Sequence, residues 1–306
     1  MTDRKKPVLL CILDGWGYNP NKIGNAIEEA NTPNWHRMLN EYPHGFLDAS
    51  GTDVGLPSGQ MGNSEVGHTN IGAGRVVIQL HGQIEQEIQT DTLKSNPYLL
   101  EFIKKVKDAN GACHLFGLLS DGGVHAHIDH IIALAKALDT NNIKTYIHIA
   151  TDGRDTPPSS AVEYVKQFID ATKDCKNVSI ATISGRYYSM DRNKTWDRTK
   201  LAYDAMTMAK SESKFTNPVD AIETSYKNGK TDEFIVPTVN ENYHGMNDGD
   251  GVLIANFRAD RVRQIASALA DPDFKDFTRE KVVKFSALLG MAEYSEELNK
   301  LYKTLF

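Results

Sequence analysis

The stretch TYIHIATDGRDTPPSSAVEYVKQFIDAT (residues 145–172) carries the pattern that decides the fold. Its apolar, β-branched run Thr145–Ala150 predicts a buried strand, and Ala161–Thr172 predicts an amphipathic helix. The polar segment Thr151–Asp155 predicts a loop at the carboxyl end of the strand. A strand, a loop and a helix in this order form the repeating unit of an α/β protein.

The same order recurs along the chain. Further strands are predicted at Val8–Leu13, His114–Leu119, Val178–Ile183, Val252–Phe257 and Lys281–Leu289, and helices at Ile84–Leu93, Tyr98–Val106, Ile128–Leu138, Asp197–Lys210 and a segment ending at Leu269. Continuous apolar strands that alternate with helices predict a parallel sheet covered on both faces. Ligands of such sheets bind at the carboxyl ends of the strands. The residues that follow the predicted strands are therefore functional candidates: Asp14, Asp121, His125, Arg154, Asp155, Arg186 and Arg258.

Length and composition indicate a folded intracellular protein. With 306 residues, about two domains are expected. The net charge of −6 argues against a nucleic-acid-binding surface, which needs a basic surplus. Cys11, Cys113 and Cys175 are far apart, which favours reduced thiols over a disulfide framework. Because no segment approaches the roughly 20 apolar residues that cross a bilayer, we expect no membrane partner and a cytoplasmic location.

The glycine-rich segment GQMGNSEVGH (59–68) surrounds one serine, Ser64. Flanking glycines let a backbone approach an anion closely, and a serine activated by a base or a metal is a nucleophile. A helix N-cap is the structural alternative, since Ser and Asn are common there. Asp14 has two interpretations as well, because its carboxylate suits a divalent cation while Asp-Gly is ordinary turn chemistry.

Arginines follow three separate predicted strands: Arg154, Arg186, Arg192, Arg258, Arg261 and Arg263. Guanidinium groups bind phosphate and carboxylate with two parallel hydrogen bonds, so their gathering at one sheet edge predicts an anion site. Arg258 and Arg261 are three residues apart and can share one face of a helical turn. Asp155 is either a general acid or base toward a hydroxyl, or only the partner of Arg154.

His125 to His130 spell HAHIDH, the HxHxDH pattern of metallo-β-lactamase-fold hydrolases. Three histidines and an aspartate at this spacing can hold two metal ions. That fold needs further ligands at later strand ends, and the remaining downstream histidines, His148 and His244, are poorly placed for this. The alternative is a helix that begins at Ile128 with His130 in its first turn.

Seven blocks together identify a family. They are ILDGWG (12–17), MGNSEVGHTNIGAGR (61–75), LLSDGGVHAHIDH (118–130), TDGRDTPP (151–158), SGRYYSMDR (184–192), WDR (196–198) and NFRADRVRQ (256–264). In this order they resemble the cofactor-independent phosphoglycerate mutases, and the resemblance spans about residues 7 to 294. It implies interconversion of 3-phosphoglycerate and 2-phosphoglycerate through a phosphoserine.

The resemblance also implies a domain plan and a set of site residues. Residues 1–79 would begin a parallel-sheet domain of alkaline-phosphatase type that holds two Mn²⁺, 80–296 would form an inserted α/β transferase domain, and 297–306 would start the return linker. Ser64 would take the phosphoryl group, Asp14 and Ser64 would bind one metal, and Asp155 would carry protons. Substrate binding would fall to His125, Arg154, Asp155, Arg186, Arg192, Arg258 and Arg261.

Family members continue well past residue 306, and the resemblance places most metal ligands in that later part. We therefore expect a truncated monomer with little or no mutase activity alone. Two alternatives remain. One is a phosphoglycerate-binding module without chemistry, and the other is a different metal-dependent phosphatase or phosphomutase.

Overall fold

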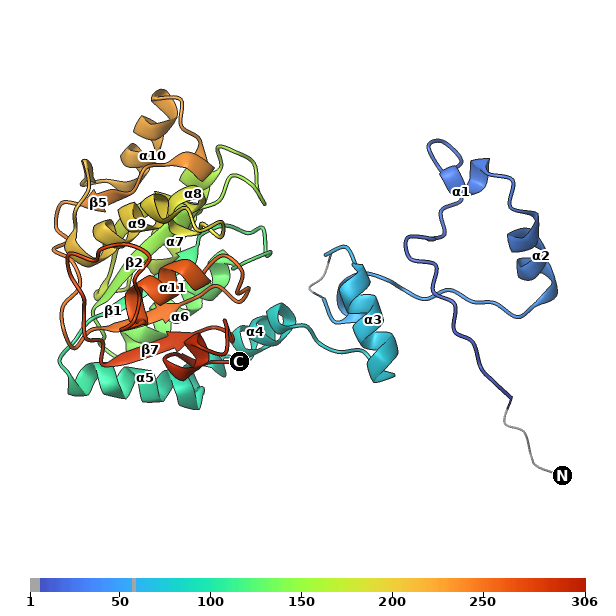
Figure 1. The fold of residues 1–306 in the computed structure, drawn as a ribbon, viewed down its shortest axis with the longest axis horizontal. Coiled ribbons are helices and arrows are strands. Elements are labelled where there is room, and N and C mark those ends of the chain that lie inside the picture. The colour runs from blue at the N-terminus through green and yellow to red at the C-terminus, as the bar shows by residue number, and fades with distance from the viewer. Residues whose placement is uncertain (1–5, 57–58) are drawn as a thin grey trace. The chain divides into compact units, whose positions relative to one another are not determined.

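The computed structural model describes residues 6–56 and 59–306. The chain divides into two compact units, of which the first ends at Gln79 and the second begins at Leu80. The second unit is built on one eight-stranded sheet (Figure 1). The strand order is β4-β5-β3-β2-β1-β6-β7-β8, with β1 at Cys113–Leu118, β2 at Thr145–Thr151, β3 at Val178–Gly185, β4 at Ser213–Phe215, β5 at Thr238–Asn240, β6 at Gly251–Ile254, β7 at Ala287–Gly290 and β8 at Lys303–Thr304.

Neighbouring strands are parallel except for β3 and β5. All six residues of β1 are buried, because strands lie on either side of it and helices cover both faces of the sheet. The predicted α/β class with a mainly parallel sheet is confirmed here. Because β1, β2, β3 and β6 all run the same way, the loops that follow them meet at one edge.

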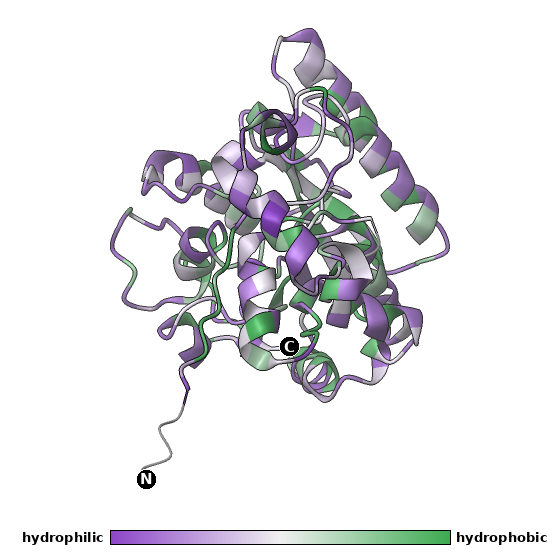
Figure 2. Ribbon diagram, turned by 90° about the vertical axis from the view of Figure 1, so that its right-hand side faces the viewer, coloured by the Kyte–Doolittle hydropathy of each residue, from purple (hydrophilic) through white to green (hydrophobic). Residues whose placement is uncertain are grey.

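Helices cover the two faces of the sheet with separate apolar cores. The helices are α4 (Leu80–Gln89), α5 (Pro97–Asp108), α6 (Ile128–Thr140), α7 (Ala161–Thr172), α8 (Arg186–Ser189), α9 (Trp196–Met208), α10 (Pro218–Lys227) and α11 (Arg263–Ala270), with short 3-10 turns at Leu93–Ser95, Asp232–Phe234 and Leu298–Lys300. One core joins α4, α5, α6, α7 and α10 to the sheet, and the other joins α9 and α11 to it. Helical ribbons of the molecule carry both hydrophobic and hydrophilic residues, as amphipathic packing requires (Figure 2).

Several predicted boundaries are corrected by the structure. The strand expected at Lys281–Leu289 begins only at Ala287, and β4, β5 and β8 were not predicted at all. Residues 297–306 contain β8, which pairs with β7, and bury Tyr302 and Leu305. The assignment of this segment to the start of a return linker stays a prediction.

The first unit contains helices but, in residues 6–56 and 59–79, no strand. Its elements are α1 (Ala26–Glu29), α2 (Pro33–Glu41), the 3-10 turn Gly51–Val54 and α3 (Ser64–Ala73). The prediction of a strand at Val8–Leu13 is wrong, since this segment is exposed, has no regular secondary structure and pairs with no strand among the described residues. A strand needs a neighbour to take its backbone hydrogen bonds, and the described part of this unit offers none.

Within the described residues, no helix combines the length and the apolar character that crossing a bilayer demands.

Candidate functional site

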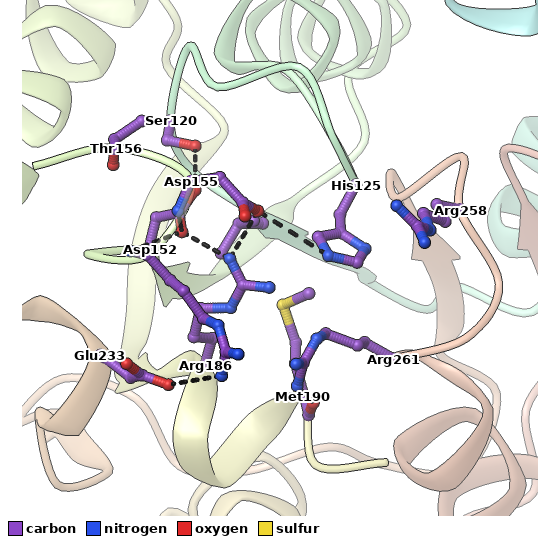
Figure 3. Close-up of polar contacts among 12 residues, drawn as sticks. Ser120, His125, Asp152, Asp155, Thr156, Arg186, Met190, Glu233, Arg258 and Arg261 are labelled. Carbon is purple, nitrogen blue, oxygen red and sulfur yellow. Dashed lines mark hydrogen bonds and ion pairs between the residues drawn. The ribbon is translucent and has the colours of Figure 1, made fainter. Parts of the chain in front are cut away.

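The loops after β1, β2, β3 and β6 form a charged site at the carboxyl edge of the sheet (Figure 3). Its centre is the guanidinium of Arg186, which opens α8 directly after β3 and is 1 % exposed. One guanidinium nitrogen, Nη1, lies 2.6 Å from Asp152 Oδ1 and 2.6 Å from Asp155 Oδ2. Burial works against this charge, but Asp155 and Asp152 raise the pKa of Arg186 above its usual value. The arginine is therefore a fixed positive charge.

Asp152 organises the loop that follows β2. Its carboxylate accepts hydrogen bonds from Ser120 Oγ at 2.7 Å and from the backbone N–H groups of Arg154 and Asp155 at 3.2 and 3.0 Å. Burial opposes ionisation, but these hydrogen bonds and Arg186 hold the pKa of Asp152 below its ordinary value. Gly153 makes the tight turn possible, because its φ is +70° and a Cβ would lie 2.9 Å from the backbone nitrogen of Glu233.

His125 lies between two carboxylates. Its Nε2 is 3.7 Å from Asp155 Oδ2, and its Nδ1 is 3.4 Å from Asp260 Oδ1. The backbone oxygen of His125 accepts hydrogen bonds from the N–H groups of Phe257 and Arg258, which ties the β1 loop to the β6 loop. Burial, followed by Arg186, lowers the pKa of His125 to about 4, although both carboxylates oppose this. The imidazole is therefore neutral near pH 7.

Four more guanidinium groups surround this centre. Arg154 pairs with Glu233 at 3.5 Å, and about half of its side chain is exposed to solvent. Arg192 and Arg258 both pair with Asp260, at 2.6 and 3.4 Å. Arg261 donates to the backbone oxygen of Met190 at 3.3 Å.

The guanidinium groups are close enough to act on one another. Burial, and then the charges of Arg186, Arg192 and Arg154, lower the pKa of Arg261 below its usual value. Such convergence of positive charge is costly without an anion, so this edge of the sheet is suited to a phosphate or carboxylate ligand.

The structure brings together one large group of the sequence-predicted residues: His125, Arg154, Asp155, Arg186, Arg192, Arg258 and Arg261. Asp121 is different, because its carboxylate accepts a hydrogen bond from Tyr164 of α7. Arg263 also points elsewhere and donates to the backbone oxygen of Tyr294.

Sequence reasoning did not single out Ser120, Asp152, Glu233 or Asp260. Asp152 directly follows a strand and Asp260 lies between two predicted anion-binding arginines, so their positions carried a signal. Glu233 carried none, because it comes from the 3-10 turn Asp232–Phe234, far away in the sequence.

Ser64 and Asp14 belong to the first unit. Ser64 is the first residue of α3, and the N-cap role considered for it belongs to Asn63, whose side chain accepts a hydrogen bond from the N–H of Val66. The Ser64 hydroxyl lies 3.2 Å from His68 Nδ1, but this nitrogen is nearer, at 2.8 Å, to the backbone oxygen of Ser64. A carbonyl oxygen only accepts, so Nδ1 donates its proton there and is no base for the hydroxyl in this arrangement. Asp14 is exposed in a turn that precedes Gly15, and no hydrogen bond joins it to Ser64 in the residues described.

The histidine-rich segment is not a metal cradle. His127 caps α6 by accepting from the N–H of Asp129, while His130 is buried against His81 and Phe257. Across residues 6–56 and 59–306, no group of three or more His, Cys, Asp or Glu side chains is arranged to hold a metal ion. Asp14 and Ser64 therefore complete no metal site by themselves.

The family model, the related sequences and a solved structure that match this chain agree with one another. The family model described as "BPG-independent PGAM N-terminus" matches residues 84–296. Proteins named 2,3-bisphosphoglycerate-independent phosphoglycerate mutase are similar over nearly the whole chain. The protein of Gluconobacter oxydans (strain 621H) is 48% identical over 301 residues, which are 98% of this chain and 58% of the relative. The protein of Clostridium perfringens (strain SM101 / Type A) is 50% identical over 300 residues, 96% of this chain and 58% of the relative.

A solved structure agrees with these relatives. The Leishmania mexicana phosphoglycerate mutase, determined at low cobalt concentration, matches with a TM-score of 0.73 and 29% identity. The match covers 95% of this chain and 56% of that one. The chain thus spans a little under three fifths of the length of the proteins that it resembles.

Proposed function

The chain belongs to the 2,3-bisphosphoglycerate-independent phosphoglycerate mutase family, and from that premise we propose that it binds phosphoglycerate for the interconversion of its 3- and 2-phosphate isomers. One observation carries the proposal: five guanidinium groups gather around a neutral imidazole and a carboxylate at one sheet edge. Phosphoglycerate offers a phosphate, a carboxylate and a hydroxyl, which match these three kinds of group.

In this proposal the second unit holds the glycerate. Arg258 and Arg261 bind the phosphate, while Arg154, Arg186 and Arg192 bind the remaining anionic and hydroxyl oxygens together with His125. Asp155 gives a proton to the glycerate oxygen that releases the phosphoryl group and then takes one from the glycerate hydroxyl that receives it. Arg186 lies 2.6 Å from this carboxylate and fixes its position. Most of the catalytic effect in phosphoryl transfer comes from such positioning and charge neutralisation.

We further propose that Ser64 is the nucleophile. Its hydroxyl loses a proton and Oγ forms a bond to phosphorus, while the bond between phosphorus and one glycerate oxygen breaks and that oxygen takes up a proton. In the second half the other glycerate hydroxyl loses its proton and bonds to phosphorus, the bond between phosphorus and Ser64 Oγ breaks, and Ser64 regains its proton. Two Mn²⁺ would supply Lewis-acid chemistry in the intact enzyme, with Asp14 and Ser64 as oxygen ligands of one ion. The described residues complete no metal site, so both ions would need ligands beyond Asp14 and Ser64.

The domain plan follows the same proposal. Residues 1–79 belong to a phosphatase-like metal-binding domain, 80–296 to the phosphoglycerate-binding domain, and 297–306 to the return between them. The protein would act on small molecules in the cytoplasm as a monomer.

Calorimetric titration of the 306-residue chain with 3-phosphoglycerate tests the proposal. We expect saturable binding, weaker binding of glycerate and of inorganic phosphate, and no transfer of the phosphoryl group when Mn²⁺ is added. Ribose 5-phosphate serves as the comparison ligand for other phosphomutases. Equal affinity for 3-phosphoglycerate and ribose 5-phosphate, or no binding of either, would contradict the assignment.

A further inference from the structure

Asp260 lies between side chains to which the proposed function assigns the binding of substrate. It lies in the turn after β6, between Arg258 and Arg261 in sequence. One carboxylate oxygen, Oδ2, is 2.6 Å from Arg192 Nη1. The other, Oδ1, is 3.4 Å from Arg258 Nε and 3.4 Å from His125 Nδ1. A single carboxylate therefore contacts three groups of the anion site at once.

The contact between Asp260 and His125 brings a potential hydrogen-bond donor and an acceptor close together. His125 Nδ1 and Asp260 Oδ1 are both buried, and neither has a hydrogen-bond partner in the part of the chain that the structure describes. Buried polar atoms are nearly always paired, so a small closure of the 3.4 Å gap satisfies both. On the other side of the ring, Asp155 Oδ2 is farther away, at 3.7 Å, and already accepts from Arg186.

These distances determine where a neutral imidazole carries its proton. A carboxylate accepts hydrogen bonds and cannot donate when ionised, so the nearer carboxylate selects the ring nitrogen that is protonated. Burial raises the pKa of Asp260, but the hydrogen bond from Arg192 and the charges of Arg258 and Arg192 oppose it, and the pKa lies below its ordinary value, so Asp260 is ionised beside a neutral His125. The Nδ1–H form of His125 then presents a lone pair on Nε2, beside Asp155.

We propose that Asp260 is a positioning residue, which fixes the Nδ1–H tautomer of His125 and anchors Arg192 and Arg258 at the rim of the site. In this arrangement His125 Nε2 accepts a hydrogen bond from a hydroxyl of the bound substrate. The last step rests on the proposed function, whereas the tautomer and the anchoring do not. Carboxylate–histidine pairs set ring orientation in the same way in other enzymes and metal sites.

The imidazole nitrogen resonances of ¹⁵N-labelled protein near pH 7 test the tautomer without any ligand. The His125 signals are identified by comparison with His125→Gln. We expect the Nδ1–H form in the native chain and in Asp260→Glu, and a mixture of both tautomers in Asp260→Asn. A dominant Nε2–H form in the native chain, or an Asp260→Asn spectrum with unchanged His125 signals, would overturn the proposal.

Calorimetry with 3-phosphoglycerate gives a second test, because the direction of the change in affinity distinguishes loss of charge from loss of positioning. Removing one negative charge alone would tighten anion binding, but loss of positioning weakens it, and we expect about tenfold weaker binding by Asp260→Asn. Glu280→Gln is the matched control, because it removes one carboxylate from an exposed pair with Lys210. Equal or tighter binding by Asp260→Asn would overturn the proposal.

The two tests separate the two hypotheses. If the native chain shows the Nδ1–H tautomer but binds no 3-phosphoglycerate, the proposed function fails while the role of Asp260 stands.

Discussion

Two apolar runs of equal length, Val8–Leu13 and His114–Leu119, have opposite structures in this molecule. Both read as strands and both are followed by an Asp-Gly loop. The second lies almost entirely in β1, buried between β2 and β6, whereas Val8 in the first is 96% exposed and its segment pairs with nothing in the described residues. The pattern sets what a segment can become, and neighbouring strands decide whether it does so.

The same contrast holds for the candidate functional residues. Arg186 is fixed by two carboxylates from another loop, so its position depends on the packing of a whole sheet edge. Ser64 has only local partners, since its hydroxyl meets His68 one helical turn later. The buried hydrophobic residues described in the first unit form one cluster of three, Val54, Leu56 and Val66.

The largest expected difference between the units is in amide hydrogen exchange. Amides of β1, β2 and β3 lie in a buried, paired sheet and are expected to exchange only when the second unit unfolds, while no hydrogen bond of the Val8–Leu13 amides is found among the described residues. We expect exchange at Val8–Leu13 to be faster by a factor of about 1,000 or more, measured by mass spectrometry. Protection of Val8–Leu13 comparable to that of β1 would remove the contrast.

A matched pair of core substitutions tests whether the two runs differ in packing. Leu115→Ala empties a fully buried position in β1, and we expect a loss of about 2–5 kcal/mol in the free energy of unfolding. Leu10→Ala trims a side chain that is 67% exposed, and we expect a change within about 0.5 kcal/mol. Denaturant titration of both variants measures the difference, and equal effects would show that Leu10 is packed in solution.

The sequence predicted the central strands because their information is local. Long apolar runs between turn residues define β1, β2, β3 and β6, and parallel pairing then places the arginines that follow them on one edge. Three short strands escaped prediction, since β4, β5 and β8 contain only two or three residues each. Segments of that size have no periodicity to detect.

The misses in the site have a different cause. Glu233 acts through Arg154, far away in the chain, so only the folded arrangement reveals it. Asp260 lies between two predicted arginines in the sequence, but its contact with the distant Arg192 appears only in the folded chain. The error at Val8–Leu13 is the reverse case, in which a correct local pattern lacks the long-range partner that would make it a strand.

Ligand binding should depend on arginines of the second unit alone. Arg258→Ala removes a charged group from the anion site, and we expect 3-phosphoglycerate affinity to fall by about tenfold to a hundredfold. Arg37→Ala is the control in the first unit, where the arginine pairs only with Glu41 on the surface of α2. Calorimetry should give unchanged affinity for this control, and an equal loss in both variants would mean that net charge alone governs binding.

The second unit should also lose stability in mild acid. Burial, followed by His81 and His127, lowers the pKa of His130 from 6.5 to about 2, so the unfolded chain binds a proton that the folded chain rejects. The resulting stability is present above pH 6.5 and is lost as the pH falls below it, by about 1.4 kcal/mol per pH unit.

His130→Leu removes this proton site, and urea titrations from pH 7 to pH 5 should show a shallower decline in the free energy of unfolding. His36→Leu, at an exposed position of α2, controls for the loss of an imidazole in the other unit. An unchanged slope in His130→Leu would mean that the buried ring takes up its proton without unfolding.

The smallest effect is expected at helix caps, and it bears directly on how far each unit is cooperative. Asn217 caps α10 by accepting from the N–H of Val219, and Asn25 caps α1 by accepting from Ile27 and Glu28. Because α10 packs into the core of the second unit through Ile222, the loss of its cap enters the global free energy of unfolding, and Asn217→Ala should cost about 1 kcal/mol. The four-residue α1 buries no side chain, so Asn25→Ala should leave the unfolding transition where it is. A shift of the same size in both variants would mean that α1 unfolds together with the sheet, and the two units would then be one cooperative structure.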